Sequence, residues 1–386
     1  MKTRPLPSEP AHRTTVTRLT PAGRGAIATL AVEGAGAMEA VGELFRPITG
    51  KPLAASPVDR IRFGIWHHDT GDQEEIVVCR RAASKFEIHC HGGDAAAAVI
   101  IAALVSRGVV LGDEATWLHR RHRDPQLEFV WRRLAEARTQ RTAGILLDQL
   151  HGAWPKALGQ IAESLEVNDR DLASGHLQHL IDLVPLGRHL TIPWKIVVVG
   201  LPNVGKSSLV NTMLGFSRCI VFDQPGTTRD IVATHTALDG WPIELMDTAG
   251  IRDGQNAIEA TGVELALSEV AAADLVVHVC DATRPDASLV DPAIARHPNV
   301  LTVENKSDLV DKPRQSSDIR TSAVTGTGVD RLIELIVHHL VPNSPTAGDA
   351  VPIGNVQIQL LADVQASINR GDIQRAVAIL AQHHGG

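Results

Sequence analysis

Residues Gly200–Ser207 read Gly-Leu-Pro-Asn-Val-Gly-Lys-Ser and match the phosphate-loop pattern G-x-x-x-x-G-K-[ST]. In such a loop the glycines let backbone N–H groups turn toward phosphate oxygens. Lys206 would reach the β- and γ-phosphates, and Ser207 would ligate Mg²⁺. The apolar run 195–199 predicts a buried parallel strand and residues 208–214 predict a helix, so the phosphates would lie at a helix N-terminus. The sequence therefore predicts that the chain binds a nucleoside triphosphate.

Two further segments follow in the order of the switch loops of GTPases. Pro225-Gly-Thr-Thr-Arg-Asp230 resembles a first switch, in which Thr228 would bind Mg²⁺ when the γ-phosphate is present. Asp247-Thr-Ala-Gly250 resembles a second switch. There Asp247 would support Mg²⁺, and the Gly250 N–H would sense the γ-phosphate. Together with the phosphate loop, they indicate a GTPase domain built on a mostly parallel sheet.

The base predicted from the sequence is guanine. Asn305-Lys-Ser-Asp308 follows the expected strand 299–303 and matches the guanine-specificity box of GTPases. A carboxylate at Asp308 can accept hydrogen bonds from both N1–H and N2–H of guanine, and adenine offers no such pair of donors. Ser322-Ala323 would support this contact from the last loop.

The water that attacks the γ-phosphate has no glutamine to orient it. Ras-like enzymes carry that glutamine directly after the second-switch glycine, and here the position is Ile251. Asn203 occupies the place where some GTPases bind K⁺ between the phosphates, as a substitute for an arginine finger. Glu259, twelve positions after Asp247, would act as general base, directly or through a bridging water. The alternatives are that Glu259 is a solvated surface residue and that hydrolysis is very slow.

The N-terminal third carries two segments of a known family. Leu19-Thr-Pro-Ala-Gly-Arg-Gly-Ala-Ile-Ala28 and Glu87-Ile-His-Cys-His-Gly-Gly93 resemble hallmark segments of the MnmE (TrmE) family of tRNA-modification GTPases. Residues 138–152 resemble its central helical domain. The resemblance implies a small N-terminal α/β domain and a helical domain, with a Ras-like GTPase domain inserted into the helical part.

The resemblance also implies the chemistry of the family. Its members are K⁺-stimulated GTPases that are activated by dimerisation of their G domains. They bind a tetrahydrofolate derivative in the N-terminal domain and act on the wobble uridine of tRNA with a flavoprotein partner, MnmG. Lys206, Thr228 and Glu259 would be catalytic, and the K⁺ ligands would be Asn203, Phe222, Gln224 and Thr227. The full set of expected nucleotide-binding residues is Asn203, Val204, Gly205, Lys206, Ser207, Ser208, Phe222, Asp223, Gln224, Pro225, Gly226, Thr227, Thr228, Asp247, Thr248, Ala249, Gly250, Asn305, Lys306, Asp308, Ser322 and Ala323.

Several departures concern the folate site. The family's folate-contacting arginine, expected on the first strand, aligns with Ala31, and the segment 112–121 replaces a lysine-bearing motif. The family ends in a Cys-x-Gly-Lys box, whereas this sequence reads Gln-His-His-Gly-Gly to Gly386. Glu87 alone is kept at a folate-contacting position. We therefore expect weak folate binding or none, in a shortened, divergent member of the family.

Composition fits a cytoplasmic protein of several domains. The chain has 386 residues, 44% of them hydrophobic, and a net charge of −7, which argues against a protein that coats nucleic acid. No apolar run reaches the ~20 residues of a membrane helix, and four scattered cysteines suit reduced thiols. We expect domains at 1–112 (family-type α/β, for folate and dimerisation), 113–190 (helical), 191–345 (GTPase) and 346–386 (shortened helical segment).

Three functions compete. The first is a Mg²⁺- and K⁺-dependent, dimeric GTP hydrolase linked to tRNA modification. The second is a paralogous regulatory GTP switch that has lost the folate and tRNA chemistry, and the third is a nucleotide-binding structural partner without useful turnover. A zinc site at His89-Cys90-His91 is a weaker alternative, because alternation puts both histidines on one strand face but no third ligand is apparent.

Overall fold

The computed structural model describes residues 13–23, 25–68, 71–122, 124–216, 219–221, 233–247, 267–284, 292–310 and 317–384. The chain divides into two compact units, Met1–Glu128 and Phe129–Gly386. Each unit has hydrophobic cores of its own.

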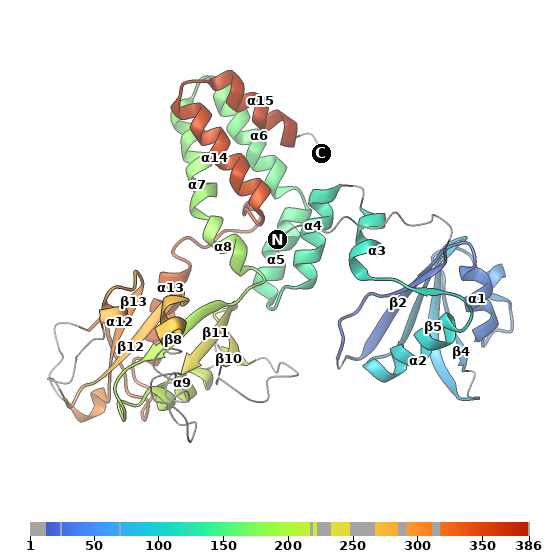
Figure 1. The fold of residues 1–386 in the computed structure, drawn as a ribbon, viewed down its shortest axis with the longest axis horizontal. Coiled ribbons are helices and arrows are strands. Elements are labelled where there is room, and N and C mark those ends of the chain that lie inside the picture. Colours follow the sequence, from blue (N-terminus) through green and yellow to red (C-terminus); the bar gives the residue numbers. More distant parts are fainter. Residues whose placement is uncertain are drawn as a thin grey trace. The chain divides into compact units, whose positions relative to one another are not determined.

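A seven-stranded sheet with strand order β3-β4-β5-β6-β2-β1-β7 forms the N-terminal unit. Its strands are β1 (Thr15–Arg18), β2 (Ile27–Glu33), β3 (Phe45–Pro47), β4 (Ile61–His67), β5 (Gln73–Ala82), β6 (Lys85–His91) and β7 (Val110–Leu111). Its helices are α1 (Ala37–Leu44), the short 3-10 helix η1 (Leu53–Ala55), α2 (Asp94–Val105) and α3 (Glu114–Arg121). Only β1 and β7 pair in parallel; the other neighbouring strands are antiparallel. The fold is the small α/β domain that the sequence predicted (Figure 1).

Strand β6 shows how the two faces of this sheet differ. Ile88 and Cys90 are buried, and Ile88 shares one hydrophobic cluster with residues of α1 and α2. Glu87, His89 and His91 alternate with them and therefore lie on the opposite face. The prediction that both histidines share a strand face is confirmed.

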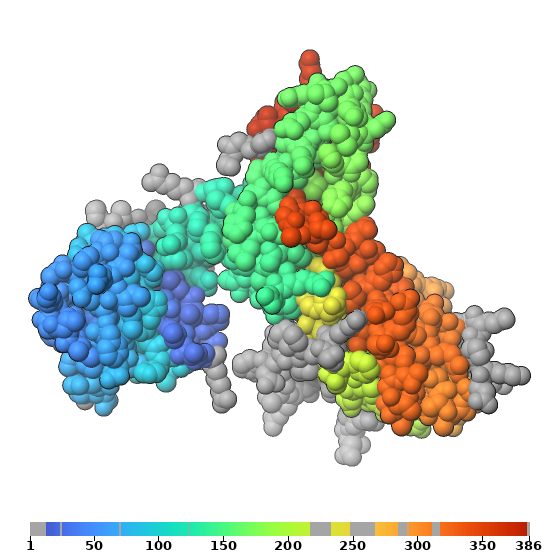
Figure 2. All heavy atoms as spheres, turned by 180° about the vertical axis from the view of Figure 1, so that it is seen from behind, coloured from blue at the N-terminus to red at the C-terminus, as the bar shows by residue number. Residues whose placement is uncertain are grey.

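Four helices of the second unit share one hydrophobic core. They are α6 (Ala153–Glu166), α7 (Arg170–Asp182), α14 (Asn355–Asn369) and α15 (Ile373–His384). Leu158, Leu177, Leu361 and Leu380, one from each helix, are at most 2% exposed and belong to the same cluster. Figure 1 shows the red C-terminal helices beside the green ones, and in the space-filling view of Figure 2 red atoms border green ones. Two of these helices precede the second sheet and two follow it, so the sheet domain is inserted into a helical domain, as predicted.

Helix α5 joins the helical part to the second sheet. The remaining helices of this part are α4 (Pro125–Ala135), α5 (Gln140–Leu150) and α8 (Val184–His189). Thr139 caps α5 by accepting a hydrogen bond from Thr142 N at 3.2 Å. The Arg141 guanidinium makes a cation–π contact 5.2 Å from the Trp241 ring centroid, and it pairs with Asp239 at 3.4 Å. The start of α5 therefore contacts the turn between β10 and β11.

The second sheet has strand order β14-β13-β12-β8-β11-β10-β9. Its strands are β8 (Trp194–Val199), β9 (Cys219–Val221), β10 (Ala233–Leu238), β11 (Trp241–Asp247), β12 (Leu275–Asp281), β13 (Val300–Asn305) and β14 (Ile319–Arg320). Its helices are α9 (Lys206–Leu214), α12 (Pro292–Ala295), the 3-10 turn η3 (Ser307–Leu309) and α13 (Val329–Leu340). The run Ile196–Val199 is at most 5% exposed, because β8 is a central strand with parallel neighbours. The predicted buried strand is confirmed.

The parallel strands β8, β11, β12 and β13 bring their carboxyl ends to one edge of the sheet. Ligands of open α/β sheets bind at this edge. The phosphate loop, Asp247, Asp281 and Asn305 all follow or end these strands. The topology thus gathers segments that are more than a hundred residues apart in the sequence, such as Val204 and Asn305.

None of the helices among the described residues is long and apolar enough to cross a membrane. The finer domain boundaries after residues 112, 190 and 345 stay a proposal.

Candidate functional site

The phosphate loop connects β8 to α9, and its glycines are required by its shape. Gly200 has φ +149°, Asn203 +65° and Gly205 +94°. A Cβ at Gly200 would lie 2.3 Å from the Val279 carbonyl oxygen, and one at Gly205 would lie 2.4 Å from Asn305 Nδ2. Glycine therefore fits both positions without strain, and the loop keeps the tight curl that a phosphate cradle needs.

Helix α9 begins at Lys206, two residues before the predicted start. The first-turn N–H groups of a helix, here including those of Ser207 and Ser208, lack intrahelical partners and can bind an anion. Lys206 is 7% exposed, and its Nζ donates hydrogen bonds to the carbonyl oxygens of Gly200 at 3.1 Å and Leu201 at 3.0 Å. The ammonium group is thus bound to the first two residues of the phosphate loop.

Two predicted magnesium-binding residues meet at the start of α9. The Ser207 hydroxyl donates a hydrogen bond to Asp247 Oδ2 at 2.5 Å, which joins the phosphate loop to the end of β11. Hydroxyl and carboxylate oxygens are ligands that Mg²⁺ prefers, and in triphosphate sites it needs only one or two protein ligands beside phosphate and water. These two side chains therefore fit a magnesium site of that kind.

Asn305 holds three segments of the site together. It is the last residue of β13, so the strand runs two residues beyond its predicted end. Its side chain is 1% exposed, and Nδ2 donates to the Val204 carbonyl oxygen at 2.9 Å. Its Oδ1 accepts hydrogen bonds from Ala323 N at 3.1 Å and Thr321 Oγ1 at 3.3 Å. The asparagine therefore fixes the phosphate loop against the last loop.

The last loop is itself well ordered by hydrogen bonds. Ser322 is fully buried, and its Oγ accepts a hydrogen bond from Thr325 N at 3.2 Å. The Ala323 carbonyl oxygen accepts one from Thr212 Oγ1 of α9 at 2.9 Å. The predicted supporting loop is thus connected to the helix that follows the phosphate loop.

Lys306 and Asp308 have different roles. Lys306 has φ +63°, and its Nζ donates to the Asn203 carbonyl oxygen at 2.6 Å and to Asp281 Oδ2 at 2.7 Å. Asp308 lies in the exposed turn η3, and its carboxylate makes no hydrogen bond or ion pair with the described part of the chain. Lys306 therefore ties the guanine box to the phosphate loop, whereas Asp308 is available to a base.

Sequence reasoning missed Asp281. This residue ends β12 and is 6% exposed. Burial opposes its ionisation, but hydrogen bonds from Lys306 and Thr283 hold the pKa of the carboxyl below its usual value. It thus stays negative beside the Lys306 ammonium. The apolar run before it, at the same sheet edge as Asp247, was the signal that could have found it.

Several predicted residues lie outside the described residues. They are Phe222, Asp223, Gln224, Pro225, Gly226, Thr227, Thr228, Thr248, Ala249, Gly250, Ile251 and Glu259. The first switch, the K⁺ loop, the tip of the second switch and the general base therefore stay predictions.

The N-terminal unit pairs Glu87 with an arginine that sequence reasoning did not single out. Ala31 lies on β2, the second strand rather than the first, directly opposite Glu87 in the register of β2 and β6. The Arg81 guanidinium, from β5, contacts Glu87 Oε2 at 2.7 Å and Asp59 Oδ1 at 3.1 Å. The His89 Nε2 lies 3.8 Å from the same glutamate. The Glu87 carboxylate is therefore already engaged by a cation.

The histidines of β6 have other partners than a metal. His89 Nδ1 lies 3.0 Å from Thr29 Oγ1, and His91 Nδ1 lies 3.1 Å from Glu74 Oε1. Within the described residues, no group of three or more His, Cys, Asp or Glu side chains could hold a metal ion.

We expect Asp308→Asn to shift the nucleotide preference away from guanine. The substitution removes the charge and one of the two acceptors that face N1–H and N2–H, which costs about 1.5–3 kcal/mol, or roughly ten- to a hundredfold in GTP affinity. Titration with GTP and ATP measures the change. Asp330→Asn, an exposed position on α13, is the matched control and should leave GTP affinity unchanged. An Asp308→Asn protein with unaltered GTP affinity would contradict the assigned role.

Comparison with known proteins finds a GTPase family, tRNA modification GTPases and the G domain of a transporter. Residues 195–307 match the family described as 50S ribosome-binding GTPase. The tRNA modification GTPase MnmE of Lactococcus lactis subsp. cremoris (strain MG1363) is 30% identical over 383 residues, covering 88% of this chain and 83% of the relative. MnmE of Syntrophotalea carbinolica is 29% identical over 378 residues, covering 86% and 82%. Among solved structures, the G domain of the T. maritima FeoB iron transporter aligns with 28% identity and a TM-score of 0.30, covering 38% of this chain and 98% of that one.

Proposed function

The chain belongs to the MnmE family of tRNA modification GTPases and hydrolyses GTP, and from this premise we propose that turnover is K⁺-stimulated and activated by dimerisation of the G domains. We further propose that the reaction serves modification of the tRNA wobble uridine, with an MnmG-like flavoprotein, in the cytoplasm. The observation that carries the GTPase assignment is the Ser207–Asp247 contact at 2.5 Å, which joins the phosphate loop to the second switch at the start of a helix.

Each residue of this site has its own role in GTP binding and hydrolysis. Backbone N–H groups at the start of α9 bind the phosphates, and the Lys206 ammonium compensates the charge of the β- and γ-phosphates. Ser207 and Asp247 would hold Mg²⁺, which neutralises charge on the phosphate oxygens when bound. Asp308 selects guanine. Positioning and electrostatic stabilisation account for most of the catalysis in phosphoryl transfer.

Two further groups are needed: one that activates the attacking water, and one that supplies the positive charge of an arginine finger. Ile251 offers no side-chain hydrogen bond to a water, so we propose Glu259 as general base. Asn203 lies in the phosphate loop with φ +65°, and its carbonyl oxygen accepts a hydrogen bond from Lys306. We propose that its side chain is a K⁺ ligand, together with the backbone of the loop that contains Phe222, Gln224 and Thr227.

We expect hydrolysis to be at least about tenfold faster in K⁺ than in Na⁺, a small part of the 10³–10⁵ that a cationic finger contributes. The rate per molecule should also rise with protein concentration, because two G domains must meet. Phosphate release at several dilutions in each salt measures both effects. Asn203→Gly removes the side chain at a positive φ that glycine adopts readily, and it should abolish the K⁺ advantage. A rate insensitive to K⁺ and to dilution would rule the mechanism out.

A folate site on the open face of the N-terminal sheet is poorly supported by its residues. The position opposite Glu87 is Ala31, which is 3% exposed and offers no polar atom beyond its backbone. The one nearby cation, Arg81, is divided between Glu87 and Asp59. A carboxylate that already accepts a guanidinium hydrogen bond has less capacity to bind the donors of a pterin ring.

We expect 5-formyltetrahydrofolate to give no measurable heat in calorimetry at micromolar protein. An arginine fork missing at Ala31 costs about 1.5–3 kcal/mol, or roughly ten- to a hundredfold in affinity. A micromolar dissociation constant that Glu87→Ala abolishes would overturn this expectation and restore folate-dependent tRNA modification as the direct role.

The ion pair between Arg81 and Glu87 favours a second function. If Glu87 serves only its ion pair with Arg81, the chain keeps the GTPase and not the folate chemistry. It would then be a regulatory GTP switch paralogous to the tRNA-modifying members of the family. Measurement of modified wobble uridine in cells with and without the gene separates the two, because only the first function predicts a loss of the modified base.

A further inference from the structure

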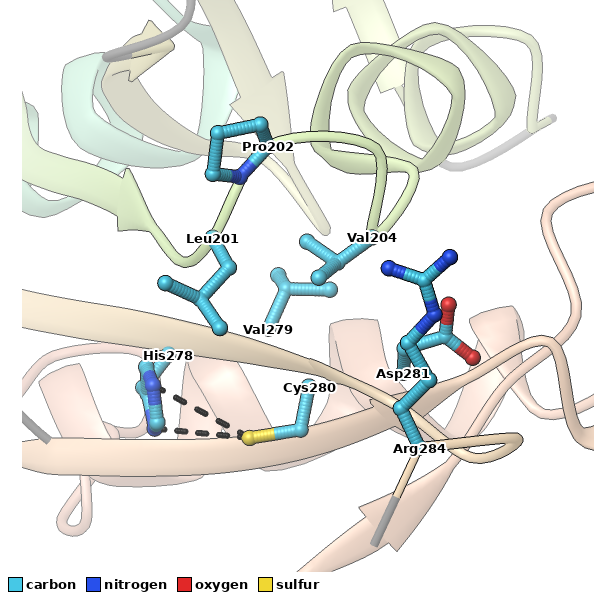
Figure 3. A pocket seen from close by; sticks show the side chains of 8 residues that line it. All are labelled: Leu201, Pro202, Val204, His278, Val279, Cys280, Asp281 and Arg284. Atoms are coloured by element: carbon cyan, nitrogen blue, oxygen red, sulfur yellow. Dashed lines mark hydrogen bonds between the residues drawn. The ribbon is translucent and has the colours of Figure 1, made fainter. Parts of the chain in front are cut away.

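A small cavity lies between the phosphate loop and the end of β12 (Figure 3). Its lining residues are Leu201, Pro202 and Val204 of the loop, together with His278, Val279, Cys280, Asp281 and Arg284. The cavity measures about 30 Å³. Because one water needs at least ~10–15 Å³ of such a cavity, there is room for about two or three waters at most. Any larger group that enters must therefore move the walls, and one wall is the phosphate loop.

A thiol and an imidazole face each other in this cavity. Cys280 and His278 are two residues apart on β12, and the Cys280 Sγ lies 3.6 Å from Nδ1 and 3.9 Å from Nε2 of the ring (Figure 3). His278 is 5% exposed, and burial lowers the pKa of its imidazole. The ring is therefore neutral at pH 7, and its unprotonated nitrogen can accept a hydrogen bond from the thiol.

The other cysteines differ from Cys280. Cys79 and Cys90 are 1% and 4% exposed, and burial raises the pKa of both thiols, that of Cys90 to about 11. Cys280 is half-buried. Because reactivity follows thiolate character and access, Cys280 is the reactive thiol among these three. The side chain of Cys219 lies outside the described residues.

We propose that Cys280 is a modification site for a low-molecular-weight disulfide of the cysteine type, and that the adduct weakens GTP binding. As Cys280 attacks one sulfur of the disulfide, its proton passes to the neutral His278 ring, which acts as a general base. A new S–S bond forms at Cys280 as the original one breaks. The leaving thiolate takes the proton back, so that Cys280 is oxidised and one half of the reagent is released as a thiol. Arg284, which lines the same cavity, offers a positive charge to the reagent's carboxylates.

The adduct would act on GTP through two neighbours of Cys280. An added sulfur and its substituent do not fit into the cavity, so they push on Leu201 and Pro202 of the phosphate loop. The next residue, Asp281, holds the Lys306 ammonium at 2.7 Å, and Lys306 donates to the Asn203 carbonyl oxygen at 2.6 Å. Displacement of either contact disturbs the loop and the guanine box together.

The test uses the full chain and glutathione disulfide. GTP affinity of the reduced protein is measured first, which tests the nucleotide site separately from this inference. We then expect one adduct, located at Cys280 by mass spectrometry, a loss of GTP affinity of at least about tenfold, and full recovery with dithiothreitol. By linkage, saturating GTP should lower the equilibrium constant for adduct formation by the same factor. Cys219→Ser should behave as the unmutated protein does.

Two variants make the inference falsifiable. Cys280→Ser, which preserves size, should bind GTP normally and be insensitive to the disulfide. His278→Gln should form the adduct at least tenfold more slowly while keeping its GTP affinity, which also shows that it is folded. An adduct at Cys280 without loss of GTP affinity overturns the proposal. So does labelling at Cys219 alone, or no adduct in native protein whose thiols react after unfolding.

Discussion

Gly205→Ala should lower GTP affinity by roughly a hundredfold. Gly205 has φ +94°, and an added Cβ would lie 2.4 Å from Asn305 Nδ2. The left-handed backbone costs about 1–2 kcal/mol for alanine, and moving Asn305 breaks its buried hydrogen bond to the Val204 carbonyl, worth about 1–3 kcal/mol. The loop will relax from this strain when it is empty and must resume it to hold phosphate. Titration with a fluorescent GTP analogue measures the loss.

The control for this variant is Gly215→Ala at the end of α9. Gly215 has φ −80°, and the nearest atom to an added Cβ is the Thr212 carbonyl oxygen at 3.5 Å, an ordinary contact. We expect GTP affinity and thermal stability close to those of the unmutated protein. If Gly205→Ala binds GTP as tightly as Gly215→Ala does, the loop does not hold the phosphates in the conformation described.

Glu259→Ala should lower kcat by roughly 10²-fold or more and leave GTP affinity nearly unchanged, because general-base catalysis contributes about 10²–10⁴ and acts in the transition state. The prediction rests on Ile251 in place of the water-orienting glutamine and on the position of Glu259 twelve residues after Asp247. Single-turnover hydrolysis with saturating protein separates the chemical step from binding.

Glu163→Ala, on the exposed side of α6, is the matched control and should hydrolyse GTP at the normal rate. A parallel loss of GTP binding in Glu259→Ala would instead identify Glu259 as a structural residue of the second switch. An unchanged kcat would leave the reaction without this general base.

The phosphate loop and the guanine box could be recognised in the sequence because their constraints are local. Glycine fits Gly200 and Gly205 for steric reasons, and the apolar, β-branched run before Gly200 favours the buried strand that the structure shows. The order of the GTPase motifs then predicted the mostly parallel sheet, since each motif ends or follows a strand at the same edge of that sheet. The helical domain was predicted from residues 138–152, and the segment 346–386, expected to be helical, contains α14 and α15.

What the sequence did not predict depends on which side chains the fold brings together. Asp281 holds Lys306 across 25 positions, and Arg81 reaches Glu87 from the neighbouring strand. Neither pair has a motif, because an ion pair needs only two side chains that the fold brings together. The strand of Ala31 was also misnumbered, since the short β1 that precedes it lacks a distinctive apolar pattern. Such features become visible only when the register of the sheet is known.

The most direct test of a guanine-specific nucleotide site is competition between GTP and ATP for a bound fluorescent GTP analogue, in Mg²⁺ and K⁺. Asp308 offers guanine a paired acceptor that adenine cannot use, so GTP should displace the analogue at concentrations at least about a hundredfold lower than ATP. Equal displacement by GTP and ATP would contradict the account.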